Sequence, residues 1–100
     1  NDSILNYGSL QIDTNNHRVV RDGVTVDLTV REYAILEYLV RNKNIVVTRE
    51  QIRANIWSID DDINSNVVDV YIRYLRRKID DPFEEKLIHT IRGVGYRLEC

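Results

Sequence analysis

Four basic side chains lie close together in residues 66–80, which read NVVDVYIRYLRRKID. They are Arg73, Arg76, Arg77 and Lys78. Such a cluster on one face of a helix can bind a negatively charged partner, and arginine can read the edge of a guanine. The same cluster can also be an ordinary charged surface that only water contacts. The distribution of these side chains around a helix separates the two interpretations.

A helix over residues 66–80 has two distinct faces. At about 100° per residue, one apolar stripe predicts a buried face. It consists of Val68, Ile72, Leu75 and Ile79. The side that faces away from this stripe holds Asn66, Val70, Arg73 and Arg77. Tyr74 and Tyr71 fall between the two faces. Asp69 has the spacing to pair with Arg73 one turn along, and Arg76 lies beside it, so we expect Asp69 to orient arginines.

Two capping boxes mark the starts of two earlier helices. The capping pairs are Thr29 with Glu32 and Thr48 with Gln51. Each threonine side chain can accept a hydrogen bond from the backbone amide of its partner, and the partner's side chain can accept one from the backbone amide of the threonine. We expect helices over residues 30–42 and 49–56. The first of these helices has a wide apolar stripe made of Tyr33, Ile35, Leu36, Leu39 and Val40.

The third helix, over residues 66–80, follows a polar, acidic loop. The candidates for its N-cap are Asn66, which has Asp69 three residues later, Ser65 and Asn64. We expect the helix to stop near Asp80, because Pro82 disfavours helical geometry at the residue before it.

Strands are expected at both ends of the chain. Residues 9–13, SLQID, alternate between apolar and polar side chains, and residues 17–28 hold two β-branched runs around Asp22-Gly23. Asp-Gly between such runs is typical of a hairpin turn. Residues 87–99, LIHTIRGVGYRLE, alternate around the turn at 93–95 and predict a second hairpin. Both glycines of that turn are expected to permit positive φ.

Composition bounds the classes of protein to which the chain can belong. Its 100 residues are enough for one domain, and 43% hydrophobic with 30% charged residues is ordinary for a globular one. The absence of methionine suggests a piece excised from a longer protein. No apolar run could span a membrane, and one terminal cysteine fits a reducing, cytoplasmic origin. A net charge of −2 argues against indiscriminate coating of nucleic acid.

Metal and catalytic chemistry have no recognisable pattern. Residues 60–66, DDDINSN, begin like a calcium loop, but Ser65 replaces the required glycine and Tyr71 occupies the place of the bidentate glutamate. His17 and His89 lie in different predicted strands, so neither a zinc site nor a Cys-His nucleophile is expected. There is no phosphate-binding glycine loop. We therefore expect no cofactor and no enzyme activity.

Three helices followed by a hairpin, with the basic face on the third, is the element order of a winged helix-turn-helix. In that architecture the third helix enters the major groove. Arg92, near the tip of the last hairpin, is then placed to reach an adjacent minor groove or a phosphate.

At this point the sequence resembles the DNA-binding effector domains of OmpR/PhoB-type response regulators. The resemblance covers essentially the whole chain and is carried by LTVREYAILEYL, TREQIRANIW, NVVDVYIRYLRRKI and TIRGVGYRL. It implies an α+β fold: a winged helix-turn-helix with an N-terminal antiparallel four-stranded sheet, a three-helix core and a C-terminal β-hairpin wing, as a single domain over residues 1–100. It also implies an N-terminal receiver domain, phosphorylated by a sensor kinase, and a dimer on tandem direct-repeat half-sites of promoter DNA. The fragment itself is expected to be a monomer.

The resemblance also implies a set of DNA-contacting residues. Those on the third helix are Asn66, Val67, Val70, Tyr71, Arg73, Tyr74 and Arg77. Arg49 and Trp57 match residues that meet phosphates, and Thr90, Arg92 and Tyr96 match the wing. Trp57 could equally seal the core, and Tyr71 departs from the polar or imidazole side chains often found at its position.

Two further interpretations remain open. In the family, the loop before the third helix often meets RNA polymerase, which here implicates Asp60, Asp61 and Asp62, although these aspartates could serve only for solubility. Alternatively, the domain is a protein-interaction module that has the winged-helix fold and does not read DNA. The negative net charge and the acidic loop support that alternative.

Overall fold

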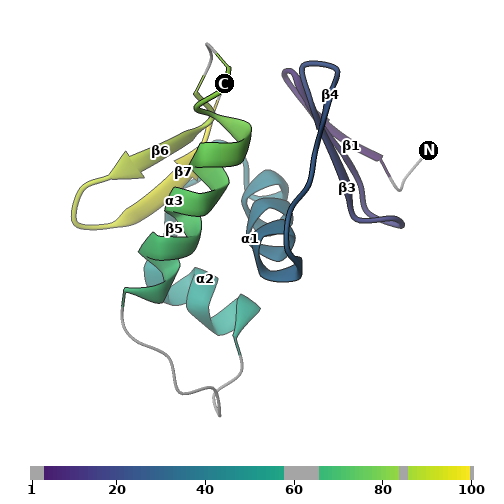
Figure 1. The fold of residues 1–100 in the computed structure, drawn as a ribbon. Coiled ribbons are helices and arrows are strands. Elements are labelled where there is room, and N and C mark those ends of the chain that lie inside the picture. Colours follow the sequence, from purple (N-terminus) through teal and green to yellow (C-terminus); the bar gives the residue numbers. More distant parts are fainter. Residues whose placement is uncertain (1–3, 58–65, 84–85, 100) are drawn as a thin grey trace.

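A computed structural model describes residues 4–57, 66–83 and 86–99. Three helices lie between an N-terminal sheet and a C-terminal hairpin (Figure 1). The N-terminal strands are β1 (Ile4–Tyr7), β2 (Leu10–Asp13), β3 (Arg18–Arg21) and β4 (Val24–Val26). They are followed by α1 (Val30–Arg41), β5 (Val47–Thr48), α2 (Arg49–Ile56), α3 (Val67–Ile79), β6 (Ile88–Ile91) and β7 (Gly95–Leu98). The predicted winged helix-turn-helix architecture is confirmed.

The N-terminal sheet is an antiparallel meander in the order β1-β2-β3-β4. The hairpin predicted at Asp22-Gly23 is present, with positive φ at both residues (52° and 80°). Such a pair forms the tight turn whose twist matches that of the flanking strands. His17 lies in the turn before β3, rather than in a strand as predicted, and its ring stacks on Tyr33 with a centroid distance of 4.3 Å.

Both predicted capping boxes are formed. The Thr29 amide donates to Glu32 Oε1 at 3.0 Å and the Thr48 amide donates to Gln51 Oε1 at 2.9 Å. Asn66, one of the three candidates, occupies the N-cap position of α3, but its side chain makes no cap hydrogen bond. A capping residue needs extended backbone, whereas Asn66 has ψ of 8°. The alternative caps, Ser65 and Asn64, lie outside the described residues.

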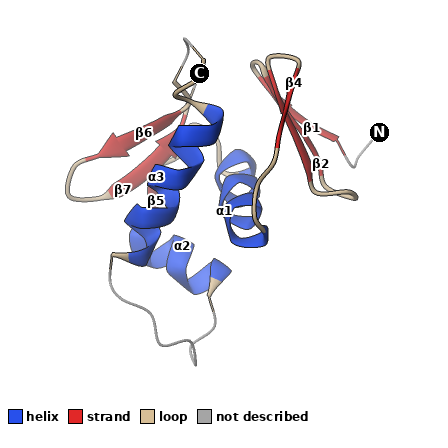
Figure 2. Cartoon of the chain, viewed as in Figure 1, coloured by secondary structure: helices blue, strands red, loops and turns tan. Residues whose placement is uncertain are grey.

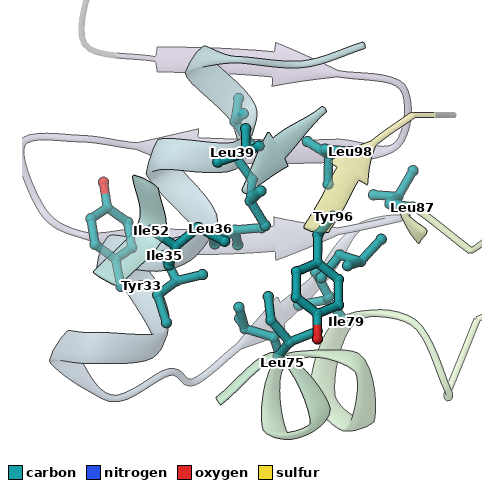
Figure 3. Packing of buried hydrophobic residues seen from close by; sticks show 14 of the residues in the cluster. Tyr33, Ile35, Leu36, Leu39, Ile52, Leu75, Ile79, Leu87, Tyr96 and Leu98 are labelled. Carbon is teal, nitrogen blue, oxygen red and sulfur yellow. The ribbon is translucent and has the colours of Figure 1, made fainter. Parts of the chain in front are cut away.

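One continuous core holds the helices to the wing. All four residues of the predicted apolar stripe of α3 and all five of α1 are buried. Figure 3 shows Leu36 and Leu39 of α1 and Tyr96 and Leu98 of β7 pointing into the same space. The core face of α3 is therefore fixed, and the opposite face must point outward.

A third strand joins the C-terminal hairpin, giving a sheet in the order β5-β7-β6. The sequence did not predict this pairing of Val47–Thr48 with β7. It explains Gly95, where an added Cβ would lie 2.1 Å from the Val47 carbonyl oxygen. Gly95 thus permits close approach of backbone, in contrast to the predicted positive φ, while Gly93 does have φ of 75°.

A buried ion pair attaches the N-terminal sheet to the end of α3. Arg21 of β3 is 1% exposed, and its Nη1 lies 3.3 Å from Asp80 Oδ1 and donates to the Ile79 carbonyl at 2.5 Å. Asp80 also accepts from the amides of Leu87 and Ile88, both at 3.1 Å. This network fixes where α3 ends and where β6 begins.

Among the described helices, none has the length and apolar character needed to cross a membrane.

Candidate nucleic-acid interface

The outward face of α3 carries the arginines that the helical wheel placed there. Asn66, Arg73 and Arg77 are exposed and Val70 is half-buried, while the core stripe is fully buried. Within the described ranges, neither Arg73 nor Arg77 has a hydrogen-bond or ion-pair partner. Figure 2 shows α3 with the wing beside it and α2 near its first turn. Two guanidinium groups that pair with no described residue thus project from a helix whose other side packs into the core.

An aromatic row borders this face. The Trp57 and Tyr71 rings meet edge to face at 5.4 Å, and the Tyr71 and Tyr74 rings at 5.8 Å. Trp57 ends α2, is 8% exposed and lies under the Arg31 guanidinium at 5.2 Å, so its ring seals the core. Its indole nitrogen donates no hydrogen bond to any described residue. The ring therefore has a structural role, and the N–H stays available to a ligand. Val67 is half-buried against the core.

The Asp69 carboxylate joins three elements. Its Oδ1 accepts from Arg49 Nε on α2 at 2.8 Å and from the Tyr96 hydroxyl on β7. The predicted pairing of Asp69 with Arg73 or Arg76 is wrong: within the described residues the carboxylate accepts from Arg49 and Tyr96. Arg73 acts on Asp69 only through its charge. No local spacing signals the Arg49 pair, since the two residues are 20 positions apart.

The ionisation of this cluster follows from its contacts. Burial alone would raise the pKa of Asp69, but hydrogen bonds from Tyr96 and Arg49 and the charges of Arg49 and Arg73 hold it below the usual value of 3.8. Burial and the Asp69 hydrogen bond raise the pKa of Tyr96 above 10.0. Asp69 is therefore an anion and Tyr96 a neutral donor at neutral pH.

The wing is fastened to α3 by Arg76. Arg76 Nη2 donates to Thr90 Oγ1 at 2.5 Å and to the Ile88 carbonyl at 3.3 Å. Arg92 is exposed at the hairpin turn, and no described residue forms an ion pair or hydrogen bond with its side chain. Tyr96 is 4% exposed, so little of it reaches the surface, and its contact with DNA stays a prediction.

A hollow of about 630 Å³ lies where the start of α2, the start of α3 and the wing turn converge. Its lining includes Arg49, Arg53 and Asn66 together with two acids, Glu50 and Asp69. The amide ends of two helices carry partial positive charge, and together with the exposed guanidinium groups they can meet an anion such as phosphate. The described residues hold no cluster of three or more side chains that could bind a metal ion. Asp60, Asp61 and Asp62 lie outside the described residues.

Comparison with known proteins identifies the family to which this chain belongs. The family model described as "Transcriptional regulatory protein, C terminal" matches residues 23–98. The transcriptional regulatory protein YkoG of Bacillus subtilis is 45% identical over 97 residues, which cover 97% of this chain and 42% of that protein. The response regulator ArlR of Staphylococcus aureus is 44% identical over 93 residues, which cover 93% of this chain and 42% of ArlR. The chain thus spans less than half the length of these relatives.

Solved structures agree with this placement. DrrB, an OmpR/PhoB homologue of Thermotoga maritima, superposes with a TM-score of 0.85 at 35% identity, over 98% of this chain and 45% of that one. The RstA DNA-binding domain of Klebsiella pneumoniae, solved in complex with the RstA box, has a TM-score of 0.84 at 30% identity, over 96% of each chain. The DNA-binding domain of the response regulator AdeR, in complex with an intercistronic region, has a TM-score of 0.85 at 29% identity, over 95% of this chain and 97% of that one.

Proposed function

The chain belongs to the C-terminal DNA-binding domains of OmpR/PhoB-type transcriptional regulators, and we propose that it reads double-stranded promoter DNA by inserting α3 into the major groove. The observation that carries the proposal is the pair Arg73 and Arg77, exposed and unpaired within the described residues, on a helix whose opposite face is locked into the core. RstA and AdeR, solved with DNA, support this role.

The proposed contact residues divide into those that read bases and those that meet the backbone. Asn66, Val70, Arg73 and Arg77 face the groove floor, and an arginine there can bind guanine O6 and N7 with two hydrogen bonds. Val67, Tyr71 and Tyr74 border that surface. Arg49 and Trp57 meet phosphates beside α2, and the wing contributes Thr90, Arg92 and Tyr96. Phosphate contacts fix the orientation of the domain, while the base contacts determine the sequence that it selects.

The rest of the proposal concerns the longer protein. Because the curated relatives are more than twice as long as the matched segment, we propose a receiver domain in the same protein, with phosphorylation producing a dimer on direct-repeat half-sites in the cytoplasm. No catalysis is assigned to the domain.

The loop with Asp60, Asp61 and Asp62 would contact RNA polymerase. Replacing the three aspartates with asparagine should then lower transcription while DNA affinity is retained, and unchanged transcription would remove the loop from the mechanism.

The test is selection of a binding site from random duplex DNA, followed by affinity measurements with Arg73→Ala and Arg77→Ala. Each loss should cost about 1 to 3 kcal/mol on the selected site if the residue reads a guanine, and much less on unrelated DNA. Arg18→Ala is the matched control, because Arg18 is an exposed arginine on the N-terminal sheet. It should leave binding to a single site unchanged.

Salt dependence separates this function from its competitor. A domain that neutralises phosphates must release counterions, so affinity should fall steeply with salt concentration. If no site is enriched from the pool while the domain is folded, or if the affinity for DNA barely changes with salt, a protein-interaction module is the better interpretation.

A further inference from the structure

We propose that Asp69 is a positioning residue for DNA binding: it holds the Arg49 guanidinium and the Tyr96 hydroxyl so that α2 and the wing meet the phosphate backbone as one unit with α3. The inference rests on the proposed DNA-binding function and deepens it. Asp69 would not touch DNA itself and would act through Arg49.

The geometry of Arg49 supports this role. Asp69 engages Nε, and the guanidinium carbon lies 5.8 Å from the centre of the Tyr96 ring. The guanidinium also interacts with the Tyr96 hydroxyl, and the side chain is 46% exposed at the hollow. An arginine held at Nε still presents two amino groups, which can bind a phosphate together. Because the side chain is already ordered, less conformational entropy is lost on binding.

The position of an acid at this surface needs an explanation, because a carboxylate close to DNA phosphates is repelled by them. Asp69 lies in the first turn of α3, and its side chain is 35% exposed. By charge alone, removing it should strengthen DNA binding. The contact with Arg49 reverses that expectation, since the cost of repulsion is offset when the acid fixes a cation that binds phosphate.

The Asp69 carboxylate also positions the wing relative to α3. The Tyr96 hydroxyl, on β7, donates to Asp69 on α3. The guanidinium carbon of Arg76 lies 5.6 Å from the centre of the Tyr96 ring, and Arg76 also donates to Thr90. The wing is thus fastened to α3 at two points. Arg76 fixes the strand β6, and Asp69 fixes the end of the wing sheet that borders the hollow.

The test is a double-mutant cycle on DNA affinity, with Asp69→Asn made in the wild-type and in the Arg49→Ala backgrounds. In the wild type we expect Asp69→Asn to weaken binding about tenfold, because Arg49 loses its charged partner. In Arg49→Ala the same change should weaken binding by a clearly smaller factor or increase affinity, because the carboxylate has lost the cation that it positions and holds only the Tyr96 hydroxyl. Asp27→Asn is the charge-matched control, since Asp27 is exposed on the connection between β4 and α1. It should have the same small effect in both backgrounds.

Three readouts make the outcome decisive. Affinities are referred to the folded fraction of each variant, measured by urea unfolding. The salt dependence of affinity should be flatter for Asp69→Asn by about one phosphate contact, although the variant has lost a negative charge. Tyr96→Phe removes the hydroxyl and keeps the ring, and it should weaken binding to a lesser degree than Asp69→Asn.

The proposal is overturned if Asp69→Asn weakens binding by the same factor in both backgrounds, which would make its role structural. It is also overturned if the change strengthens binding in both, which would make the acid only repulsive. Arg73→Ala is measured in parallel. If Arg73→Ala lowers affinity and the Asp69 cycle is additive, only the positioning role fails. If neither Arg73→Ala nor Arg77→Ala affects binding to a selected site, the proposed reading of DNA by α3 itself fails.

Discussion

Replacing Arg21 with methionine should destabilise the domain far more than its distance from the DNA-binding face suggests. Arg21 and Asp80 are 1% and 3% exposed, so both charges are removed from water. Arg21→Met leaves the Asp80 carboxylate buried without its cation and leaves the Ile79 carbonyl without its donor at 2.5 Å. Breaking a buried pair of this kind costs about 3 to 5 kcal/mol.

That cost is a large share of the total, because a domain of this size is stable by about 5 to 15 kcal/mol. Arg21→Met is a cleaner change than removal of Asp80, since Asp80 also accepts from two buried amides. The matched control is Arg41→Met. Arg41 pairs with Glu37 one turn earlier on α1, but its side chain is 53% exposed, so about 0.3 to 0.5 kcal/mol is expected.

The assay is urea unfolding of the two variants and the wild type at the same pH and salt. Arg21→Met should shift the midpoint strongly toward lower urea, with an unchanged slope, while Arg41→Met should hardly move it. Equal midpoints for the two variants would refute the reasoning, because they would show that the buried pair is worth no more than an exposed one. Affinity for DNA, referred to the folded fraction, should be the same for both.

Two further predictions concern single contacts. Burial opposes ionisation of Glu32, but hydrogen bonds from Lys78 at 2.7 Å and from its capping partner hold its pKa below 4.5. The ionised Glu32 therefore stabilises the fold above pH 4.5, and this stabilisation is lost as the pH falls through the lower pKa of the folded state. The unfolding midpoints of wild type and Glu32→Gln should converge in acid. A constant gap between the two midpoints would contradict this. Gly95→Ala should be strongly destabilising because its Cβ would lie 2.1 Å from the Val47 carbonyl oxygen, whereas Gly93→Ala meets open space and carries only the cost of φ at 75°, about 1 kcal/mol. Thermal unfolding should rank the two alanine variants in that order, and equal losses would count against it.

Most of the elements could be predicted because their signals are local. A capping box places its two partners three residues apart, and the apolar stripe of α3 repeats within each turn. The exposed positions of Arg73 and Arg77 follow from the same periodicity once the opposite face is buried. Asn66 occupies the N-cap position without its side-chain hydrogen bond for a related reason: spacing alone does not reveal whether the backbone of the capping residue is extended.

By itself, the sequence determined the helices, the hairpin at Asp22-Gly23 and the outward face of α3, because neighbours a few residues apart decide each of them. Only the tertiary structure decided which charged groups, distant from each other in the sequence, form ion pairs. Arg21 meets Asp80 from 59 positions away, and Arg49 meets Asp69 from 20. In each pair, the acid also has nearer cations along the chain, and only the packing of sheet, helices and wing selects the partner. The network that supports the DNA-binding face therefore arises from the fold.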